Sequence, residues 1–313
     1  MTTSRNTNQQ SMANWWRLAN KVLSIWPEHK GFLDKATKAL SDDESRAIDD
    51  LAELITRIAS DHLDSLAEDY RWTCEQLVQE ELHFRRTGSY RRTKFQDVLD
   101  EVYNNSGFMG RYINGLLMSQ ALWANHARAF YLYLSAFLPK NVADYDHLEI
   151  GPGHGLWLYQ TINDKRCKSV SGWDVSQTSI AKTAAILDSL GMPKKVELSL
   201  HDIQIQSTTS ISSFDSVVIS EVLEHLESPQ TALSRIFDVM RPKGRLFVNM
   251  PINSPAPDHI YLLQKPVDVW NLIDAAGFRI TEKHCCPATG YSLEKAERLS
   301  ATISCIVIAE KPE

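Results

Sequence analysis

Three glycines, spaced two residues apart, follow a short apolar run near the middle of the chain. Residues 147–150 lead into Gly151, Gly153 and Gly155, and a helical pattern begins directly after them. Glycine lets the backbone turn sharply and approach a ligand without a Cβ clash. The start of a helix also presents unpaired backbone amides, which bind polar or anionic groups. The pattern therefore predicts a ligand-binding loop.

Acidic residues follow the next two predicted strands. Asp174 stands about 20 positions beyond the glycines, where a carboxylate can accept hydrogen bonds from both hydroxyls of a ribose. Asp202 follows the third strand and can accept from an exocyclic amine, and Ile203 beside it can flank an adenine ring. The ligand is therefore expected to contain a nucleoside. A dinucleotide site shares this logic, but its Gly-x-Gly-x-x-Gly pattern would put the third glycine where Leu156 stands.

The elements that position these residues differ between the two halves of the chain. From residue 144 onward, short apolar runs alternate with helical patterns, which is typical of βαβ units and a mainly parallel sheet. Residues 14–138 instead predict helices throughout, with a capping box at Ser41 and one long helix from about Ile113 to Leu134. We therefore predict a helical domain, residues 1–143, and an α/β domain, residues 144–313. The predicted strands, of which the last two form an antiparallel hairpin, are 147–150, 169–173, 196–200, 216–219, 245–250, 279–285 and 304–309.

Six motifs in the second half resemble those of class I S-adenosylmethionine-dependent methyltransferases. They are most similar to the branch that includes ubiquinone, menaquinone and natural-product methyltransferases. The motifs are Leu-Glu-Ile-Gly-Pro-Gly-His-Gly, Gly-Trp-Asp-Val-Ser, His-Asp-Ile, Glu-Val-Leu-Glu-His-Leu, Arg-Pro-Lys-Gly-Arg-Leu and Ala-Ala-Gly-Phe. The resemblance implies a Rossmann-like seven-stranded sheet of order 3-2-1-4-5-7-6 and S-adenosyl-L-methionine as the cofactor. It covers just over half of the chain, and the helical half resembles no family.

The resemblance also implies which residues surround each part of the cofactor. The implied cofactor-binding residues are Glu149, Gly151, Gly153, His154 and Gly155 near the methionine end, Asp174 and Val175 near the ribose, Asp202 and Ile203 near the adenine, and Ser220 and Glu221 beneath the sulfonium.

Catalysis of methyl transfer needs alignment and exclusion of water above all. An enolic carbon, phenol or carboxyl acceptor must also lose a proton, and histidine is the usual base near neutral pH. His259, in a proline-rich segment after the fifth strand, is the first candidate for this base. The alternative is that Asp258 and His259 only hold the loop in place. Tyr261 and His126 are the next candidates, although His126 lies in an aromatic stripe of the kind that usually forms core.

Other histidines and cysteines are not expected to do chemistry. The resemblance places His225 behind the loop that follows the fourth strand, away from the acceptor. His284, Cys285 and Cys286 are adjacent on one predicted strand, so their side chains point to opposite faces and cannot all bind one metal. No metal site is predicted.

The composition limits the partners. Of the 313 residues, 33 are Lys or Arg and 39 are Asp or Glu, so the net charge is −6. This mild acidity argues against nucleic acids and anionic membranes, which both attract basic surfaces. The five cysteines are scattered, and the polar first ten residues lack a leader pattern, which together indicate a reduced, cytoplasmic protein. No apolar run is long enough to span a membrane.

A small molecule or short peptide is the expected acceptor, methylated at oxygen or carbon. The fourth strand ends in Ser220-Glu221 rather than in the Asn-Pro-Pro-Tyr type of sequence found in enzymes that methylate bases or glutamine. The helical half is expected to cap the acceptor site or to form a homodimer contact, because its apolar stripes must pack against something. Two alternatives stay open: a quinone- or lipid-directed methyltransferase, and a nucleoside-binding regulatory protein without catalysis.

A basic cluster is expected to be a solvated loop, or else a site for an anionic substrate or a partner chain: Arg85, Arg86, Arg91, Arg92 and Lys94.

Overall fold

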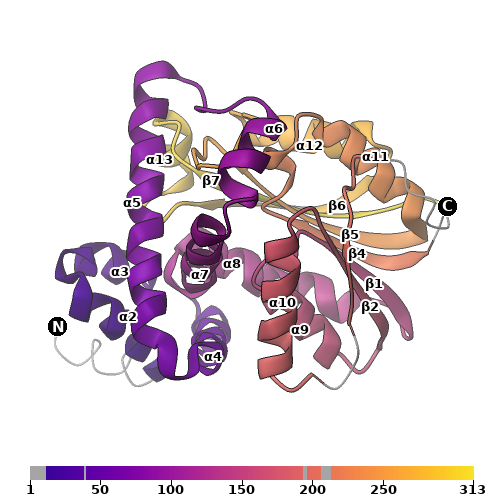
Figure 1. The fold of residues 1–313 in the computed structure, drawn as a ribbon. Helices are drawn as coiled ribbons and strands as arrows, with labels where there is room; N and C mark the ends of the chain where they lie inside the picture. The colour runs from indigo at the N-terminus through magenta and orange to yellow at the C-terminus, as the bar shows by residue number, and fades with distance from the viewer. Residues whose placement is uncertain (1–11, 39, 193–195, 206–212) are drawn as a thin grey trace.

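The computed structural model describes residues 12–38, 40–192, 196–205 and 213–313, and its second half is built on one seven-stranded sheet (Figure 1). The first ten residues, which are predicted not to form a leader, lie outside the described part. The strands are β1 (Tyr145–Ile150), β2 (Cys167–Asp174), β3 (Val196–Leu200), β4 (Phe214–Ser220), β5 (Met240–Ile252), β6 (Arg279–Pro287) and β7 (Ile303–Glu310). Their order is β3-β2-β1-β4-β5-β7-β6, and β7 is antiparallel to both neighbours. The predicted strand order and the terminal hairpin are thereby confirmed.

Helices connect the strands and cover both faces of the sheet. They are α9 (Leu156–Asn163), α10 (Gln177–Ser189), α11 (Pro229–Val239), α12 (Pro266–Ala275) and α13 (Leu293–Arg298). Figure 1 shows α9 and α10 on one side of the sheet and α11 and α12 on the other. Consecutive strand residues point to opposite faces. Accordingly, Val218 and Phe247 belong to the core on the α9 side, whereas Val217 and Val248 belong to the core on the α11 side.

The first half is helical, as predicted. Its helices are α2 (Ala13–Ile25), α3 (Lys30–Ala36), α4 (Asp42–Ala59), α5 (Leu63–Thr87), α6 (Phe95–Val98), α7 (Ser106–Leu122) and α8 (Ala124–Leu132). Short 3₁₀ turns occur at Pro27–His29, Ser60–His62, Leu138–Lys140 and Leu223–His225, and π-helical turns occur at Leu99–Tyr103 and Tyr133–Phe137. The capping box at Ser41 is confirmed, since its hydroxyl accepts from the Glu44 amide while the Glu44 carboxylate accepts from the Ser41 amide.

One predicted helix is wrong in its length. The chain breaks at Trp123, whose extended backbone separates α7 from α8. The Trp123 indole donates to the Tyr70 hydroxyl at 2.9 Å, and the Ala124 amide donates to Thr289 Oγ1 at 2.8 Å. Thr289 thus satisfies the Ala124 amide that a continuous helix would have paired internally, and Tyr70 holds the Trp123 ring in place. The break turns α8 so that it packs on the sheet beside β6 and β7.

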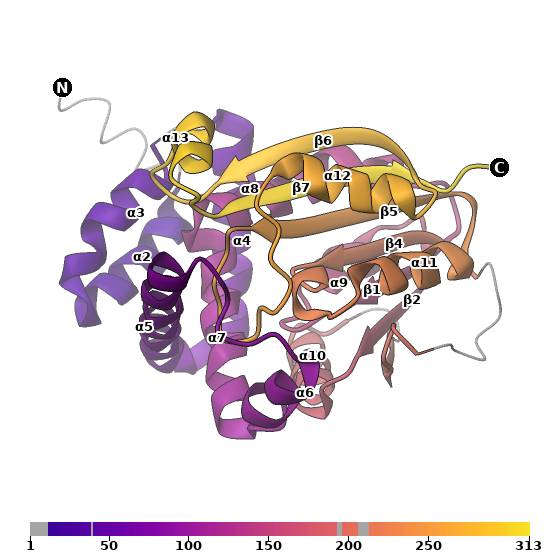
Figure 2. The same cartoon turned by 90° about the horizontal axis from the view of Figure 1, so that it is seen from above.

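The two halves share one apolar core. Helix α8 and the turn after it place Tyr133 and Phe137 against Phe247 of β5, with ring centroids 5.7 and 5.5 Å apart. Trp157 of α9 joins the same group at 5.3 Å from Phe247. Figure 2, seen from above, shows α8 running close to the sheet while α5 and α7 lie beyond its edge. The helical half is therefore packed into the fold rather than attached to it by a linker.

Four of the five residues of the basic cluster are exposed, as the solvated loop requires, but two members also tie the halves of the chain together. Arg85 donates to the carbonyl of Leu299 at 2.5 Å, and Arg92 donates to the carbonyl of Pro257 at 2.8 Å. Arg92 also pairs with Glu101 at 2.7 Å, and Arg91 pairs with the buried Glu80 at 3.0 Å.

Within the described ranges, no helix is both long enough and apolar enough to cross a membrane.

Candidate functional site

A cavity of about 170 Å³ opens at the carboxyl ends of β1, β2 and β4. This edge is where α/β proteins bind ligands. One wall comes from the glycine loop and the residues that follow β2 and β3. The other comes from the helical half, which contributes Tyr103, Met109, Tyr112, Ile113 and Leu116. The cavity thus has a polar end at the sheet and an aromatic, apolar end at α7.

The glycine loop requires glycine at its first position for two reasons. Gly151 has φ of +69°, and a Cβ there would lie 2.4 Å from Val222 Cγ2. Gly153 also has positive φ, but a Cβ there would meet open space, with its nearest neighbour at 3.9 Å. The hydroxyl of Thr183 donates to the Gly153 carbonyl at 2.7 Å and holds the loop against α10. Backbone at this point can therefore approach a ligand closely.

Two acidic residues occupy the predicted places at the ends of β2 and β3. Asp174 Oδ1 accepts from the Ser176 amide at 2.8 Å, and burial raises the pKa of Asp174 to about 6. Asp202 Oδ1 accepts from the Gln204 amide at 2.9 Å. Both carboxyls line the cavity together with the buried Ile203. Asp174, Asp202 and Ile203 therefore face one cavity, as the sequence predicts for a nucleoside site.

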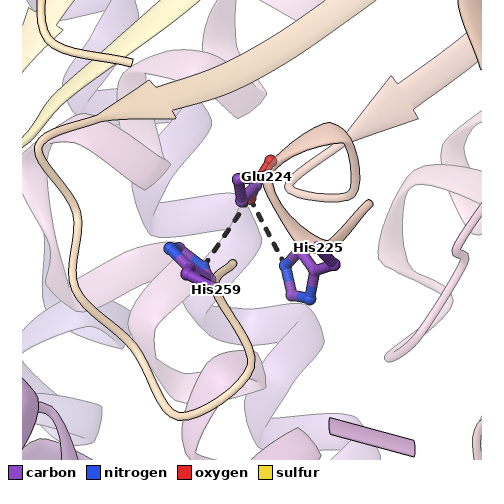
Figure 3. A group of neighbouring side chains, drawn as sticks. All are labelled: Glu224, His225 and His259. Atoms are coloured by element: carbon purple, nitrogen blue, oxygen red, sulfur yellow. Dashed lines mark ion pairs between the residues drawn. The ribbon is translucent and has the colours of Figure 1, made fainter. Parts of the chain in front are cut away.

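Polar side chains from two segments meet at the cavity wall, where His225 and His259 line it. Figure 3 shows Glu224 and His225, from the loop after β4, facing His259, from the loop after β5. Glu224 Oε1 lies 3.4 Å from His225 Nε2 and 3.8 Å from His259 Nε2. Glu224 is fully buried, and the two histidine side chains are 12% and 7% exposed. This group, Glu224, His225 and His259, is called the His–Glu cluster below.

Asp258 connects the His–Glu cluster to the helical half. Its Oδ1 accepts from the Tyr112 hydroxyl at 2.9 Å, and its Oδ2 lies 3.2 Å from His225 Nδ1. The Tyr103 hydroxyl lies 2.6 Å from the same Nδ1. His259 Nδ1 donates to the Ser254 carbonyl at 2.5 Å, which leaves its Nε2 on the side of Glu224.

The charges of the cluster are strongly coupled. Burial lowers the pKa of His225, but Asp258 and Glu224 outweigh burial and raise that pKa well above its ordinary value. Burial also opposes ionisation of Asp258, but His225 and His259 outweigh it and lower the pKa of Asp258 to about 2. For His259, burial and the neighbouring His225 lower the pKa, so this imidazole is neutral near pH 7.

Comparison with known protein families identifies the domain that forms the sheet end of the cavity. A family model described as a methyltransferase domain matches residues 148–246. The match runs from β1 into β5, so it includes the glycine loop, Asp174, Asp202 and the turn that carries Glu224. The strand order of the sheet is the one that class I methyltransferases share. The chain carries a class I, S-adenosylmethionine-dependent methyltransferase domain.

Solved structures with a similar fold include several methyltransferases. The N-methyltransferase NodS from Bradyrhizobium japonicum, in complex with S-adenosylhomocysteine, is 21% identical with a TM-score of 0.45, covering 60% of this chain and 86% of that one. The cyclase SpnF is 19% identical with a TM-score of 0.47, covering 58% and 81%. A methyltransferase from Methanosarcina mazei is 16% identical with a TM-score of 0.42, covering 54% and 93%. At these scores the similarities carry no information about the acceptor. None of the curated proteins matches the sequence.

The methyltransferase's own residues fit S-adenosylmethionine. Glu149 is buried at the end of β1, and its Oε2 has no hydrogen-bond partner among the described residues. An ammonium group, such as that of the cofactor's methionine part, would satisfy this oxygen. Asn249 fixes the floor nearby, because its amide donates to Ser220 Oγ at 3.1 Å and to Glu221 Oε1 at 2.9 Å. Of the residues predicted to bind cofactor, all except Gly155 line the cavity: Glu149, Gly151, Gly153, His154, Asp174, Val175, Asp202, Ile203, Ser220 and Glu221.

The three residues predicted to lie on the acceptor side differ in whether they line the cavity. His259 lines the cavity, whereas Tyr261 is not among the described residues that do so, and its backbone amide donates to the Glu224 carbonyl. His126 lines the cavity, but its Nδ1 lies 2.9 Å from Ser119 Oγ, and burial lowers the pKa of His126 to about 3. The expectation that His225 packs behind the loop is wrong, because the 3₁₀ turn Leu223–His225 directs it to the cavity wall.

Glu224 and Tyr103 are site residues that the sequence reasoning missed. Glu224 stands beside His225 in an otherwise apolar run, and this is the signal that could have found it. Two adjacent polar residues are buried at low cost only when they are paired with each other or with another group. Tyr103 lies in a π-helical turn, and its place at the end of an apolar stripe at helical spacing gives no sign that its hydroxyl faces a histidine.

Proposed function

We propose that this methyltransferase acts on a small molecule or short peptide, at an oxygen or carbon atom that must lose a proton. The acceptor would lie at the end of the cavity formed by the helical half. Apart from Gln120 and His126, the side chains there are aromatic or aliphatic, and Tyr103, Met109 and Tyr112 among them suit a flat or apolar acceptor. This wall also excludes water, which favours transfer over hydrolysis.

The state of His259 is the observation that carries this proposal. Its Nδ1 donates to the Ser254 carbonyl, which fixes the tautomer and leaves the lone pair on Nε2. Its pKa is lowered, so the imidazole is free to accept a proton near pH 7. It stands at the cavity wall beside the aromatic end, where an acceptor would present its acidic group.

The chain's residues would then act in a simple sequence. S-adenosylmethionine supplies a methyl group made electrophilic by the positive sulfur. Asp174, Asp202 and the glycine loop hold the cofactor, and the aromatic wall aligns the acceptor with it. The acceptor's proton moves to Nε2 of His259. The electron pair left on the acceptor forms the new bond to the methyl carbon, and the pair of the broken bond stays on sulfur.

Transfer of a labelled methyl group tests the proposal. Full-length protein is incubated with methyl-labelled S-adenosylmethionine and a small-metabolite extract of the source organism. We expect label in a soluble small molecule, in an O-methyl or C-methyl group. Label in quinones or other lipids would instead favour the lipid-directed alternative. Cofactor binding without turnover would favour the regulatory alternative.

Variants of His259 test its role once a labelled product is in hand. His259→Ala is expected to lower turnover by about 10²-fold or more, the usual scale for a positioned base, with little change in cofactor affinity. His259→Asn keeps a polar group but cannot act as a base, so it should be equally impaired. If His259→Asn retains most of the turnover, His259 only positions the acceptor. Circular dichroism of each variant confirms that the fold persists.

A further inference from the structure

We propose that the His–Glu cluster binds a divalent transition-metal ion at the acceptor end of the cavity. Glu224, His225 and His259 each offer one ligand atom, and these three atoms all lie within 4.8 Å of one another. Figure 3 shows both imidazoles turned toward the single carboxylate. Two histidines and one carboxylate form a donor set that suits zinc and iron(II).

The distances agree with a common centre. Zinc binds imidazole nitrogen and carboxylate oxygen at about 2.0–2.2 Å, so two ligands at a tetrahedral angle are roughly 3.4 Å apart. Glu224 Oε1 lies 3.4 Å from His225 Nε2 and 3.8 Å from His259 Nε2. These two distances are close to tetrahedral values, whereas all three ligand atoms lie only within 4.8 Å of one another, so the two imidazoles would have to move toward each other when an ion binds.

Three polar atoms of the cluster lack a hydrogen-bond partner among the described residues. Glu224 is fully buried, and neither of its carboxylate oxygens has a hydrogen-bond partner in the part of the chain that the structure describes. The same is true of His225 Nε2. Buried groups of this kind are almost always paired, with protein, water or an ion. No lysine or arginine is among the described residues that line the cavity, so a bound cation would replace the protonated His225 as the positive charge that compensates Glu224 and Asp258.

The second ring nitrogen of each histidine in the cluster makes the kind of contact that is usual for a metal-binding histidine. A ligating histidine usually donates its second ring nitrogen to a carboxylate or a backbone carbonyl, which fixes the ring and its tautomer. His225 Nδ1 faces Asp258 Oδ2 at 3.2 Å, and His259 Nδ1 donates to the Ser254 carbonyl at 2.5 Å. Asp258 is itself held by the Tyr112 hydroxyl at 2.9 Å. Both rings are therefore oriented with Nε2 toward Glu224.

The ion would deepen the proposed function, on which this part of the inference rests. Three protein ligands leave positions for an acceptor hydroxyl, and binding to a divalent ion lowers the pKa of that hydroxyl. His259 would then be a ligand, and the acceptor's proton would pass to water instead of to the imidazole. The bonds made and broken at the methyl carbon are unchanged. Binding of the ion itself does not depend on any methyl acceptor.

Binding of Zn²⁺ to the full-length protein is the first test. The protein is stripped with a chelator, dialysed, and titrated with Zn²⁺ by calorimetry, and its metal content is measured by mass spectrometry. We expect one equivalent per chain. Co²⁺ offered in place of Zn²⁺ should show the visible absorption of an ion with nitrogen ligands. Less than a tenth of an equivalent of Zn²⁺ would overturn the inference.

Variants show where the ion binds. Asp258→Asn should weaken Zn²⁺ binding by roughly 10–100-fold, as for other outer-contact changes, and Glu224→Gln by more than that. His126→Asn is the matched control, since His126 lines the same cavity outside the cluster, and should leave Zn²⁺ affinity unchanged. Equal affinity in Glu224→Gln and wild type would place any bound ion elsewhere and refute the assignment. If Glu224→Gln fails to fold, loss of the Co²⁺ spectrum in His259→Asn gives the same evidence.

The two proposals fail in different ways. Methyl transfer that persists in the chelator, by protein free of metal, refutes the ion's part in catalysis but leaves the proposed function standing. One tightly bound Zn²⁺ in a protein that transfers no methyl group supports the metal site and contradicts the proposed function.

Discussion

The affinity for S-adenosylmethionine is expected to fall when the pH is lowered from 7.5 to 5, because Asp174 titrates in this range. Burial raises the pKa of Asp174 to about 6 in the cofactor-free protein. The ionised carboxylate can accept from both ribose hydroxyls, and these bonds lower its pKa in the complex. A protonated carboxyl must lose its proton before it can bind in this way. Affinity is therefore full above the free-state pKa and is lost below it.

The size of the effect follows from that pKa. At pH 5, one unit below the pKa, about one molecule in eleven carries the carboxylate. The affinity should therefore be about tenfold weaker than at pH 7.5, which corresponds to roughly 1.4 kcal/mol. Isothermal calorimetry over this range measures it directly, and circular dichroism at each pH checks the fold.

Asp174→Asn is the matched control for this effect. Asparagine keeps an oxygen for the Ser176 amide, which lies 2.8 Å from the native carboxylate, but it carries no charge to titrate. A charge-assisted hydrogen bond is worth roughly 1.5–3 kcal/mol, so the variant should bind at least about tenfold more weakly at pH 7.5. It should also show the same affinity at both pH values. Wild-type affinity that is constant with pH would refute the ribose role, and an unchanged pH slope in Asp174→Asn would assign the titration to another group such as Glu149.

Two further predictions concern the packing of the helical half. Gly115→Ala should lower the free energy of unfolding by about 1–3 kcal/mol, because its Cβ would lie 2.0 Å from Thr73 Oγ1 where α5 meets α7. In the same helix, a Cβ at Gly110 meets no described atom within 4 Å, so Gly110→Ala should raise the free energy of unfolding by about 0.5–1 kcal/mol. Equal changes in the free energy of unfolding for the two variants, measured by urea denaturation, would contradict this account. Tyr112→Phe removes the donor 2.9 Å from Asp258 and should lower the free energy of unfolding by about 1–3 kcal/mol. An unchanged denaturation midpoint would show that water replaces that hydroxyl at no cost.

The cofactor end could be predicted because its signals are local. The three glycines and the acids after β2 and β3 each follow their strand directly, and parallel strands bring their carboxyl ends to one edge. The strand order came from the resemblance, which covers this same part of the chain. Each predicted cofactor residue therefore lies within a few residues of a strand end, where the pattern alone determines its place.

The acceptor end could not be predicted in the same way, because it depends on contacts between distant segments. The Glu224 carbonyl accepts from the amides of Ile260 and Tyr261, both at 2.9 Å, and so fastens the loop after β5 to the turn after β4. This places the rings of His225 and His259 with centroids 4.8 Å apart. No local pattern shows that two loops meet, so His225 was placed on the wrong side of its turn. The break at Trp123 has the same cause, since it depends on Tyr70 and Thr289.

Asp258 links the helical half to the cavity wall, which supports the proposal that this half helps to form the acceptor site. One of its oxygens is held by Tyr112 of α7, and the other orients His225. Tyr103, from the turn before α7, contacts the same histidine. The family match ends at residue 246, so it includes neither Asp258 nor either tyrosine. The proposed cofactor-binding residues thus lie in the part of the chain that matches the methyltransferase domain, whereas Asp258, Tyr103 and Tyr112 lie outside it. Acceptor choice should accordingly change with substitutions in α7 that leave cofactor affinity intact.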